Sequence, residues 1–315
     1  MPEAFNNQTM TRSGYAAIVG RPNAGKSTLL NRIVGEKIAI VSDKPQTTRT
    51  RILGAKNYPG GQIVFVDTPG IHRPLHRMNV RMVDAAVDAL GEVDAVVLLH
   101  DASAKPGHGD EYVSKLLKKV DVPIVLALNK IDRVRKSSLL PMIEKLQSWA
   151  KFAEIVPVSA ATGDGVELLE RVLLAAMPEG DALFPEDFLT DQPERALVAE
   201  TVREKVLRHT RDELPFSTAV AIDQFDEPAR PGGLMRVFCT IFVESESQKP
   251  IVIGRAGSMI KKIGTEARED IERFFNCKVF LDLRVKVKPD WRDDEKVLDE
   301  LGLPRKTKGQ GSLET

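Results

Sequence analysis

The sequence predicts an α/β domain built on a doubly wound, mostly parallel sheet, followed by a smaller α+β domain. The chain has 315 residues, and a domain usually holds about 100–200 residues, so two domains are expected. From residue 15 to about residue 177, short apolar runs alternate with longer helical patterns. The alternation stops near Pro178, and a different order of elements follows. This change indicates a second fold after the first.

The first half has the pattern of parallel strands covered by helices on both faces. The expected strands are almost continuously apolar, as buried strands should be; they are residues 15–19, 62–66, 95–99, 123–128 and 155–158. The expected helices carry apolar residues at helical spacing; they are residues 79–90, 110–120, 136–151 and 166–177. Residues 49–58 are expected to add an edge strand. In such a sheet, ligands bind at the carboxyl ends of the strands.

The second half begins after a segment rich in proline and acidic residues, which predicts a linker. A helix over 194–214, strands over 218–224 and 234–244, a helix over 258–275 and a strand over 278–288 are expected to follow. The predicted organisation is an N-terminal extension over 1–14, a first domain over 15–180, a linker over 181–195, a second domain over 196–290, a C-terminal segment over 291–303 and a frayed tail over 304–315.

Composition excludes several classes of protein. Apolar residues make up 42% and charged residues 29% of the chain, which is far from the composition of disordered proteins. No apolar run approaches the roughly 18 residues of a spanning helix. The first dozen residues lack a signal-peptide pattern, so the cytosol is the expected compartment. Two cysteines, Cys239 and Cys277, are too few for a disulfide framework and are expected to be reduced packing residues.

Charge is balanced over the whole chain but not locally. The 45 basic residues match 45 acidic residues. Between residues 249 and 288, ten Lys or Arg stand against five Asp or Glu. Any contact with a nucleic acid is therefore expected in this region.

A phosphate-binding loop follows the first expected strand. The run Gly20-Arg-Pro-Asn-Ala-Gly-Lys26-Ser27 fits the pattern G-x-x-x-x-G-K-[ST] between a strand and a helix. Its glycines let backbone N–H groups turn toward one anion, and the following helix presents its positive end. Lys26 can reach the β- and γ-phosphates, and Ser27 is the expected Mg²⁺ ligand.

A second motif selects the base. Asn129-Lys130-Ile131-Asp132 follows an apolar strand, and Asp132 can accept two hydrogen bonds from guanine, while Asn129 can meet the opposite edge of the base. A site built on such bonds rejects adenine by a factor on the order of 10⁴. Ser159-Ala160 can close over the ring through a backbone N–H. Taken singly, residues 129–132 can be a plain loop and Ser159-Ala160 a helix cap.

A third motif supplies the metal side of the site and a switch. Asp67-Thr68-Pro69-Gly70 follows the strand of residues 62–66; Asp67 offers a metal-side carboxylate, and the N–H of Gly70 can approach the γ-phosphate. The run Pro45-Gln-Thr47-Thr48-Arg49 can bring a threonine to Mg²⁺ when the γ-phosphate is present. Thr48 is the preferred ligand and Thr47 the second choice, while the alternative is that both only bond within a loop.

Hydrolysis is expected to be slow. Phosphoryl transfer depends mainly on positioning and charge neutralisation, with Lys26 and Thr48 as the expected contributors. Ile71 stands where Ras carries a glutamine that orients water. Asn23 can help hold a monovalent cation near the phosphates. His72 is more readily explained as a solvated loop histidine than as a catalytic one.

The residues expected to contact nucleotide are Gly20, Arg21, Pro22, Asn23, Ala24, Gly25, Lys26, Ser27, Thr28, Asp67, Thr68, Pro69, Gly70, Ile71, Asn129, Lys130, Ile131, Asp132, Ser159 and Ala160. The expected metal ligands among the side chains are Ser27, Thr48 and Asp67.

The basic region contains a turn that can clamp a nucleotide backbone. Its sequence places G-x-x-G at the start of an amphipathic helix, within a helix-strand-strand-helix-strand order typical of KH folds. Alone, such a turn is weak evidence. With the basic excess and the order of elements it predicts binding of single-stranded RNA. The expected contacts are Ile253, Gly254, Arg255, Ala256, Gly257, Lys261 and Lys262.

These motifs together resemble the Era-type GTPases over about residues 15–303. The resemblance rests on GRPNAGKS at Gly20, PQTTR at Pro45, DTPGIH at Asp67, NKID at Asn129, SA at Ser159, VIGRAGSMIKKIG at Val252 and PDWRDDEKVLDELGL at Pro289. It implies a P-loop GTPase domain joined to a type II KH domain, and GTP hydrolysis to GDP with Mg²⁺. Asn23 falls where related GTPases coordinate K⁺.

The resemblance also implies partners. They are the 3′ region of small-subunit ribosomal RNA, the 30S subunit during its maturation, and the inner face of the membrane as a peripheral contact; a monomer is expected. The hypothesis is a GTP-hydrolysing switch. Its rival is an RNA-binding scaffold that holds nucleotide with negligible turnover. A tRNA-modifying GTPase would need a further catalytic domain and a terminal cysteine, which this sequence does not have.

Overall fold

The computed structural model describes residues 11–70, 76–105, 108–118, 120–230 and 232–303. It divides into two compact units. The first comprises the ranges Met1–Glu36, Arg51–Thr68 and Val87–Asp191. The second comprises Lys37–Thr50, Pro69–Ala86 and Gln192–Thr315. Two stretches of the first half of the sequence, residues 37–50 and 69–86, thus group with the second half.

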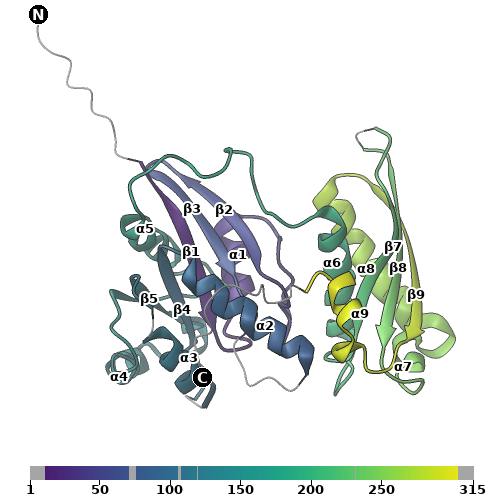
Figure 1. Cartoon of the computed structure of the whole chain (residues 1–315), viewed down its shortest axis with the longest axis horizontal. Helices are drawn as coiled ribbons and strands as arrows, with labels where there is room; N and C mark the ends of the chain where they lie inside the picture. The colour runs from purple at the N-terminus through teal and green to yellow at the C-terminus, as the bar shows by residue number, and fades with distance from the viewer. Residues whose placement is uncertain (1–10, 71–75, 106–107, 119, 231, 304–315) are drawn as a thin grey trace, which may run out of the picture. The chain divides into compact units, whose positions relative to one another are not determined.

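The first unit is built on a six-stranded sheet (Figure 1). Its order is β2-β3-β1-β4-β5-β6, and every pair is parallel except β2 with β3. The predicted mostly parallel sheet and its edge strand are therefore confirmed. The strands are β1 (Arg12–Gly20), β2 (Ile52–Tyr58), β3 (Gly61–Asp67), β4 (Ala95–Asp101), β5 (Ile124–Asn129) and β6 (Glu154–Pro157).

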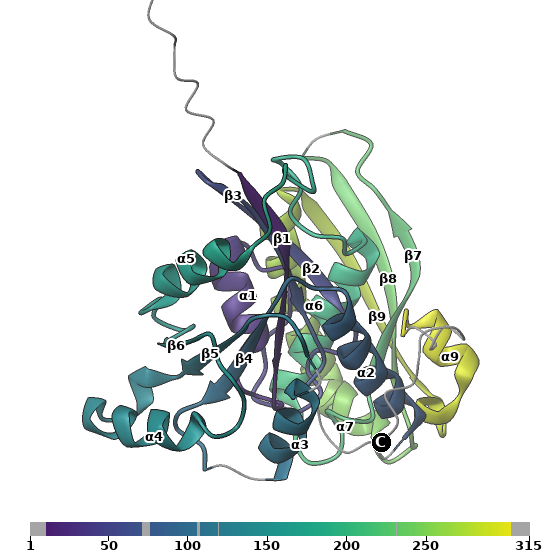
Figure 2. The same cartoon turned by 60° about the vertical axis from the view of Figure 1, so that its left-hand side comes forward.

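Helices cover this sheet. The helices α1 (Lys26–Val34) and α5 (Val166–Ala176) pack against its strands, and Figure 2 shows them together on one face. The first unit also contains α3 (His108–Leu117) and α4 (Leu139–Leu146), while most of α2 (Arg77–Asp88) groups with the second unit. The strands are covered on both faces, since β4 and β5 are buried almost throughout.

One helix of this half is shorter than expected. Residues 136–151 were predicted as one helix, but a 3₁₀ turn precedes α4 and the helix ends at Leu146. The Ser148 hydroxyl donates to the Lys145 carbonyl at 3.0 Å. Serine competes in this way for helix carbonyls, which favours a turn over another helical residue.

The second unit contains a three-stranded sheet with two long helices on one face (Figure 1). The order is β7-β8-β9, with β7 antiparallel and β9 parallel to β8. The elements are α6 (Glu194–His209), β7 (Ala219–Asp226), β8 (Leu234–Val243), α7 (Lys249–Ile253), α8 (Ser258–Phe275), β9 (Lys278–Val287) and α9 (Glu295–Glu300). The predicted order is confirmed, and the short helices α7 and α9 are additions that the sequence analysis did not identify.

The core of this unit lies between its helices and its sheet. Val198, Val202 and Val206 of α6 pack with the buried apolar face of α8 and with β8. Helix α6 ends at His209 rather than near Leu214, because the Thr210 hydroxyl bonds the Val206 carbonyl at 2.7 Å and the chain turns extended there. The packing of α6 on α8 fixes the helix that follows the G-x-x-G turn.

Both cysteines are free, buried thiols, as expected. Burial raises the pKa of Cys239 to about 12, so the reactive thiolate is disfavoured and the residue serves packing. In the described ranges, no helix combines the length and the apolar character that crossing a bilayer requires.

Candidate functional site

The loop between β1 and α1 has the shape that its glycines predict. Gly25 caps α1 with φ 100°. A Cβ on Gly25 would lie 2.4 Å from Nδ2 of Asn129, and one on Gly20 would lie 2.4 Å from the Leu99 carbonyl oxygen. Only glycine lets the loop approach its neighbours this closely and turn its N–H groups inward. The loop and the first turn of α1 therefore form an anion cradle.

Lys26 lies at the floor of this cradle. Its side chain is buried, and its Nζ donates to the carbonyl oxygens of Gly20 at 3.3 Å and Arg21 at 3.1 Å. Burial lowers the pKa of Lys26, and the nearby Asp67 opposes this effect. A buried ammonium group held mainly by carbonyl dipoles favours an anion beside it.

Ser27 and Asp67 meet as the sequence predicts for a metal site. The Ser27 hydroxyl donates to Oδ2 of Asp67 at 2.7 Å, and Asp67 is fully buried. The hydroxyl of Thr68 donates to the Ile18 carbonyl at 2.9 Å, which fixes the end of β3. One hydroxyl and one carboxylate are hard oxygen donors that suit Mg²⁺ when phosphates and waters complete its shell. Across the described residues, no group of three or more His, Cys, Asp or Glu could hold a metal ion.

Asp132 is oriented for recognition of a base. It lies in the short turn after β5, and Oγ of Ser159 donates to its Oδ1 at 2.6 Å. The Asp132 side chain is 27% exposed. The fixed carboxylate can accept hydrogen bonds from N–H groups on one edge of a ring. The structure therefore brings together Asp132 and Ser159, which the sequence analysis assigned to the same pocket.

Asn129 has a role that the sequence did not reveal. Its Nδ2 donates to the Ala24 carbonyl at 2.8 Å, and its Oδ1 accepts from the Ala160 N–H at 2.9 Å. Asn129 thus ties the phosphate-binding loop to the loop after β6. Its amide therefore fixes the position of one loop relative to the other.

Lys130 also bonds the phosphate-binding loop. It has φ 64°, and its Nζ donates to the Asn23 carbonyl at 2.7 Å and to Oδ2 of Asp101 at 2.5 Å. Burial raises the pKa of Asp101, but hydrogen bonds from Lys130 and Ser103 outweigh it and lower the pKa overall. Asp101 is a further site residue. Its position at the end of β4, beside Asn129 of β5, was a signal in the sequence.

Arg21 and Asn23 occupy special positions within the phosphate-binding loop. Arg21 points to α3, where its Nη1 contacts Oδ2 of Asp110 at 2.8 Å. Asp110 is buried, so Arg21 has a structural partner. Asn23 has φ 63°, a conformation that asparagine tolerates better than most residues.

The predicted switch residues lie in segments that group with the second unit. Thr48 is buried, and the Thr47 hydroxyl donates to the Lys44 carbonyl at 2.6 Å. The choice of Thr48 over Thr47 as the metal ligand stays a prediction. Pro69 and Gly70 are buried. Ile71 and His72 lie outside the described residues.

The G-x-x-G turn has the backbone geometry expected for a clamp. Gly254 and Gly257 both have φ 75°, and Ala256 between them has φ 50°. A Cβ on Gly254 would lie 2.6 Å from the backbone N of Met259, while open space surrounds that of Gly257. The turn leads directly into α8, and the side chains of Arg255, Lys261 and Lys262 are exposed, while Ile253 is half-buried. Positive charge and a helix N-terminus thus meet at one surface.

A groove of about 370 Å³ runs beside this turn, between α8 and β9. A Cβ on Gly264 would lie 3.4 Å from the Leu283 side chain, in ordinary van der Waals contact with it. The ring of Phe280 is exposed, and its centroid lies 5.7 Å from that of the Phe238 ring. Residues 279–283 form the β9 wall of the groove. The sequence analysis did not identify this wall, although the alternating pattern of the strand was a usable signal. The groove is lined by Ile260, Lys261, Gly264, Thr265, Arg268, Val279, Phe280, Leu281, Asp282 and Leu283.

Comparisons with known proteins find a family match in each half of the chain. Residues 15–130 match the family "50S ribosome-binding GTPase", and residues 213–292 match the KH domain. The chain is 52% identical over 291 residues to GTPase Era of Geobacter metallireducens, covering 92% of this chain and 97% of that protein. It is 46% identical over 295 residues to GTPase Era of Heliobacterium modesticaldum, covering 94% and 98%.

Solved structures give the same result for the fold. A crystal structure of Era in complex with MgGDPNP and nucleotides 1506–1542 of 16S ribosomal RNA matches with a TM-score of 0.89 and 40% identity, covering 93% of this chain and 99% of that one. An Aquifex aeolicus Era variant bound to GDP.AlF4- matches with a TM-score of 0.88 at 40% identity and the same coverage. With this identity over nearly its whole length, the chain belongs to the Era family of GTPases, in which a P-loop GTPase domain is followed by a KH domain.

Proposed function

We propose that this protein is a GTP-hydrolysing switch that binds the 3′ region of small-subunit ribosomal RNA through its KH domain and acts in maturation of the 30S subunit. The observation that carries the proposal is that one chain combines an Asp132 carboxylate fixed by Ser159 at 2.6 Å with a groove between α8 and β9. A guanine base would bind at Asp132, and RNA would bind in the groove. The groove lies beside the G-x-x-G turn.

On the nucleotide side, the proposed roles follow the geometry of the first unit. Lys26 would hold the β- and γ-phosphates, and Ser27 and Asp67 would hold Mg²⁺, with Thr48 as a further ligand in the triphosphate state. Bound Mg²⁺ would neutralise charge that develops during phosphoryl transfer. The residues of the chain bind and orient the nucleotide. The Ile71 position offers no polar side chain to align water, so intrinsic turnover is slow.

The assignment of sites and domains is part of the proposal. The GTPase domain would span residues 15–180 and the KH domain residues 196–290, joined by the linker 181–195. Asn23 would help to hold K⁺, which would speed hydrolysis relative to Na⁺. The protein would act in the cytoplasm as a monomer, with peripheral contact to the inner face of the membrane.

On the RNA side, the groove and the turn have complementary tasks. The G-x-x-G turn and the exposed charges of Arg255, Lys261 and Lys262 would hold the backbone. The apolar wall of the groove, with Leu281 and Leu283 of β9, would face unstacked bases. The relative solved with nucleotides 1506–1542 of 16S ribosomal RNA supports this choice of RNA.

Phosphate release by the full-length chain tests the nucleotide half of the proposal. GTP and ATP are compared, with and without an RNA oligonucleotide of the 16S 3′ end and with K⁺ or Na⁺. We expect hydrolysis of GTP but not ATP, and its loss in Lys26→Ala and Asp67→Ala. Lys151→Ala, an exposed lysine of the same unit, is the control. Phosphate release that persists in both variants and does not change with RNA or K⁺ would not come from this site. That result would favour the rival hypothesis, an RNA-binding scaffold with negligible turnover.

RNA binding is tested with two glycines of matched geometry. Gly257 has φ 75° and Gly232 has φ 71°, and open space surrounds the Cβ position of each. Gly257→Asp should weaken binding of the 16S oligonucleotide by about tenfold or more, because it places a negative charge where the phosphate backbone would lie. Gly232→Asp should bind like the wild type. Equal binding by the two variants would contradict the assignment of the turn.

A further inference from the structure

The segment of residues 37–50, which contains Thr48, is held by the second unit at both of its ends. Residues 37–50 contain neither a helix nor a strand, so no backbone ladder fixes their conformation. The arrangement of such a segment depends on the side chains that anchor it. The side chains that bond this segment therefore determine the position of Thr48.

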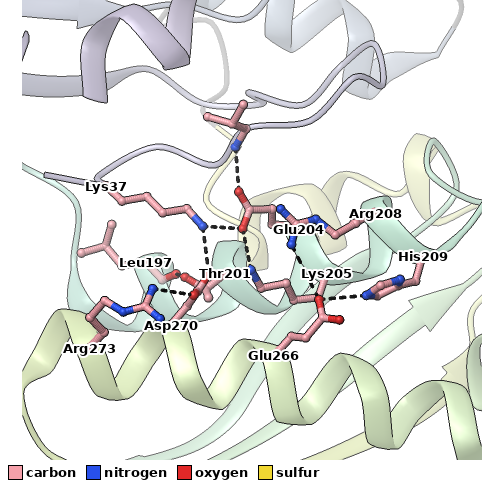
Figure 3. Close-up of polar contacts among 11 residues, drawn as sticks. Lys37, Leu197, Thr201, Glu204, Lys205, Arg208, His209, Glu266, Asp270 and Arg273 are labelled. Atoms are coloured by element: carbon pink, nitrogen blue, oxygen red, sulfur yellow. Dashed lines mark hydrogen bonds and ion pairs between the residues drawn. The ribbon is translucent and has the colours of Figure 1, made fainter. Parts of the chain in front are cut away.

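The first anchor is a network of charges (Figure 3). Nζ of Lys37 contacts Oε2 of Glu204 at 2.5 Å and Oδ2 of Asp270 at 3.0 Å, and the backbone N–H of Val41 donates to Oε1 of Glu204 at 2.9 Å. Lys205 bonds the same two carboxylates, and both it and Glu204 are buried. A buried carboxylate between two lysines holds its partners firmly, because releasing one partner would leave charge uncompensated.

The second anchor brackets Thr48 directly. On one side, Nη2 of Arg203 donates to the Thr47 carbonyl. On the other side, Nη1 of Arg49 donates to the Thr218 carbonyl at 2.8 Å, and its guanidinium lies 5.5 Å from the centre of the Trp291 ring. Burial lowers the pKa of Arg49, which reflects how fully the group is removed from water.

The anchoring side chains are themselves rigid. Arg203 is 1% exposed and its guanidinium makes two further bonds to the Glu200 carboxylate, at 2.7 and 2.6 Å. Trp291 is fully buried, and its Nε1 donates to the Ser217 carbonyl at 2.9 Å. Side chains whose own positions are fixed by packing and hydrogen bonds can position a third group.

The same helix also contacts the helix that follows the G-x-x-G turn. Helix α6 carries Arg203 and Glu204, and its valines pack on α8. Asp270, which shares Lys37 with Glu204, lies on α8. One face of α6 thus holds the segment of residues 37–50, while another supports the RNA-binding groove.

We propose that Arg203 and Trp291 position Thr48 for GTP hydrolysis. Arg203 acts through its bond to the Thr47 carbonyl, and Trp291 acts through its contact with Arg49. Arg203 and Trp291 then act on the reaction through the segment of residues 37–50, which groups with the same unit as they do. This inference rests on the proposed function, because it requires Thr48 to act on the metal-bound triphosphate. Arg203 and Trp291 act through the backbone of residues 47–49 and do not themselves meet the nucleotide.

The test is the kinetics of GTP hydrolysis by full-length Arg203→Met. We expect kcat to fall by about 10- to 100-fold, as a misplacement near 1 Å does in other enzymes, and the Mg²⁺ concentration for half-maximal rate to rise. Affinity for GDP should stay within about twofold, because switch segments are ordered by the γ-phosphate. Binding of the 16S oligonucleotide should also be retained, since Arg203 is buried and does not line the groove.

Two matched variants separate positioning from loss of structure. Arg208 lies on the same helix, is 61% exposed and only approaches Glu266 at 3.8 Å, so Arg208→Met should hydrolyse GTP like the wild type. Lys37→Met removes part of the first anchor, and because its side chain is 42% exposed this variant should fold. It should show a smaller fall in kcat with GDP affinity unchanged. Wild-type kcat in Arg203→Met would overturn the inference.

A double mutant tests the route through Thr48. If Arg203 acts by positioning Thr48, then Thr48→Ala combined with Arg203→Met should be no slower than Thr48→Ala alone. Independent, multiplying losses would refute the inference while leaving the proposed function intact. Failure of the proposed function looks different, because the wild type itself would then not hydrolyse GTP.

Discussion

Asp132→Asn probes the base pocket with a nearly isosteric change. Ser159 can still donate to the Oδ1 of asparagine, as it does to that of Asp132 at 2.6 Å. The amide nitrogen then replaces the second carboxylate oxygen on the side of the base. A donor would face the donors of guanine, whereas xanthine presents a carbonyl at the corresponding position and would accept a bond from it.

The size of the effect follows from the bonds that are lost. Each hydrogen bond to a charged group contributes about 1.5–3 kcal/mol, so the loss of two would weaken guanine binding by about 3–6 kcal/mol. The side chain is 27% exposed, and solvent screening favours the lower half of this range. A loss of about 3–4 kcal/mol corresponds to roughly a 10²- to 10³-fold weaker affinity.

Calorimetric titration of GDP and XDP into the wild type and the variant measures this directly. GDP affinity should fall by the stated factor and XDP affinity should rise. Asp121→Asn, which removes one exposed charge from the same unit, should change neither. A fall in GDP affinity of less than about threefold, below the value of a single weak hydrogen bond, would refute the assignment of Asp132 to the base.

Three further predictions concern stability and the phosphate-binding loop. Trp291→Ala should lower the free energy of unfolding by about 3–5 kcal/mol in urea titrations, because it removes a fully buried ring from the packing of the second unit; a change under about 1 kcal/mol would contradict that packing. Gly25→Ala should weaken GTP binding by about tenfold or more, since φ is 100° and the new Cβ would lie 2.4 Å from Asn129. Gly35 ends α1 at φ 88° with open space around it. Gly35→Ala should therefore strain the end of the helix but bind GTP normally. Burial raises the pKa of Asp270, but hydrogen bonds from two lysines lower it to about 2 from an ordinary 3.8, so its contribution to stability is present above pH 4 and is lost as pH falls toward 2. Unfolding measured between pH 5 and 3 should therefore be less pH-dependent in Asp270→Asn than in the wild type, and equal slopes would refute the pairing.

The order of elements could be predicted because burial leaves a simple pattern in the sequence. Strands covered on both faces are continuously apolar, and β4 and β5 are examples whose limits were predicted within two residues. Helix ends were harder. The ends of α4 and α6 depend on Ser148 and Thr210 bonding to nearby carbonyls, a local choice that apolar spacing does not reveal.

The nucleotide motifs could be predicted for a related reason. Phosphate and guanine recognition depend on short runs of fixed chemistry at the ends of adjacent parallel strands, so spacing alone brought Asp132 and Ser159 into one pocket. Of the residues that line the groove proposed for RNA, the sequence analysis had named only Lys261. Its β9 wall has no motif, because an apolar strand residue such as Leu281 has the same chemistry in a core as in a groove.

The sequence by itself determined the fold of each half and the motifs from which the two sites are proposed, because local motifs and apolar periodicity encode both. Only the tertiary structure decided what holds the segment around Thr48. Arg49 and Trp291 are 242 positions apart in the chain, and Arg203 lies on a helix whose apolar spacing says nothing about a polar contact. Such contacts arise from the packing of distant segments, and no periodicity in either segment records its partner.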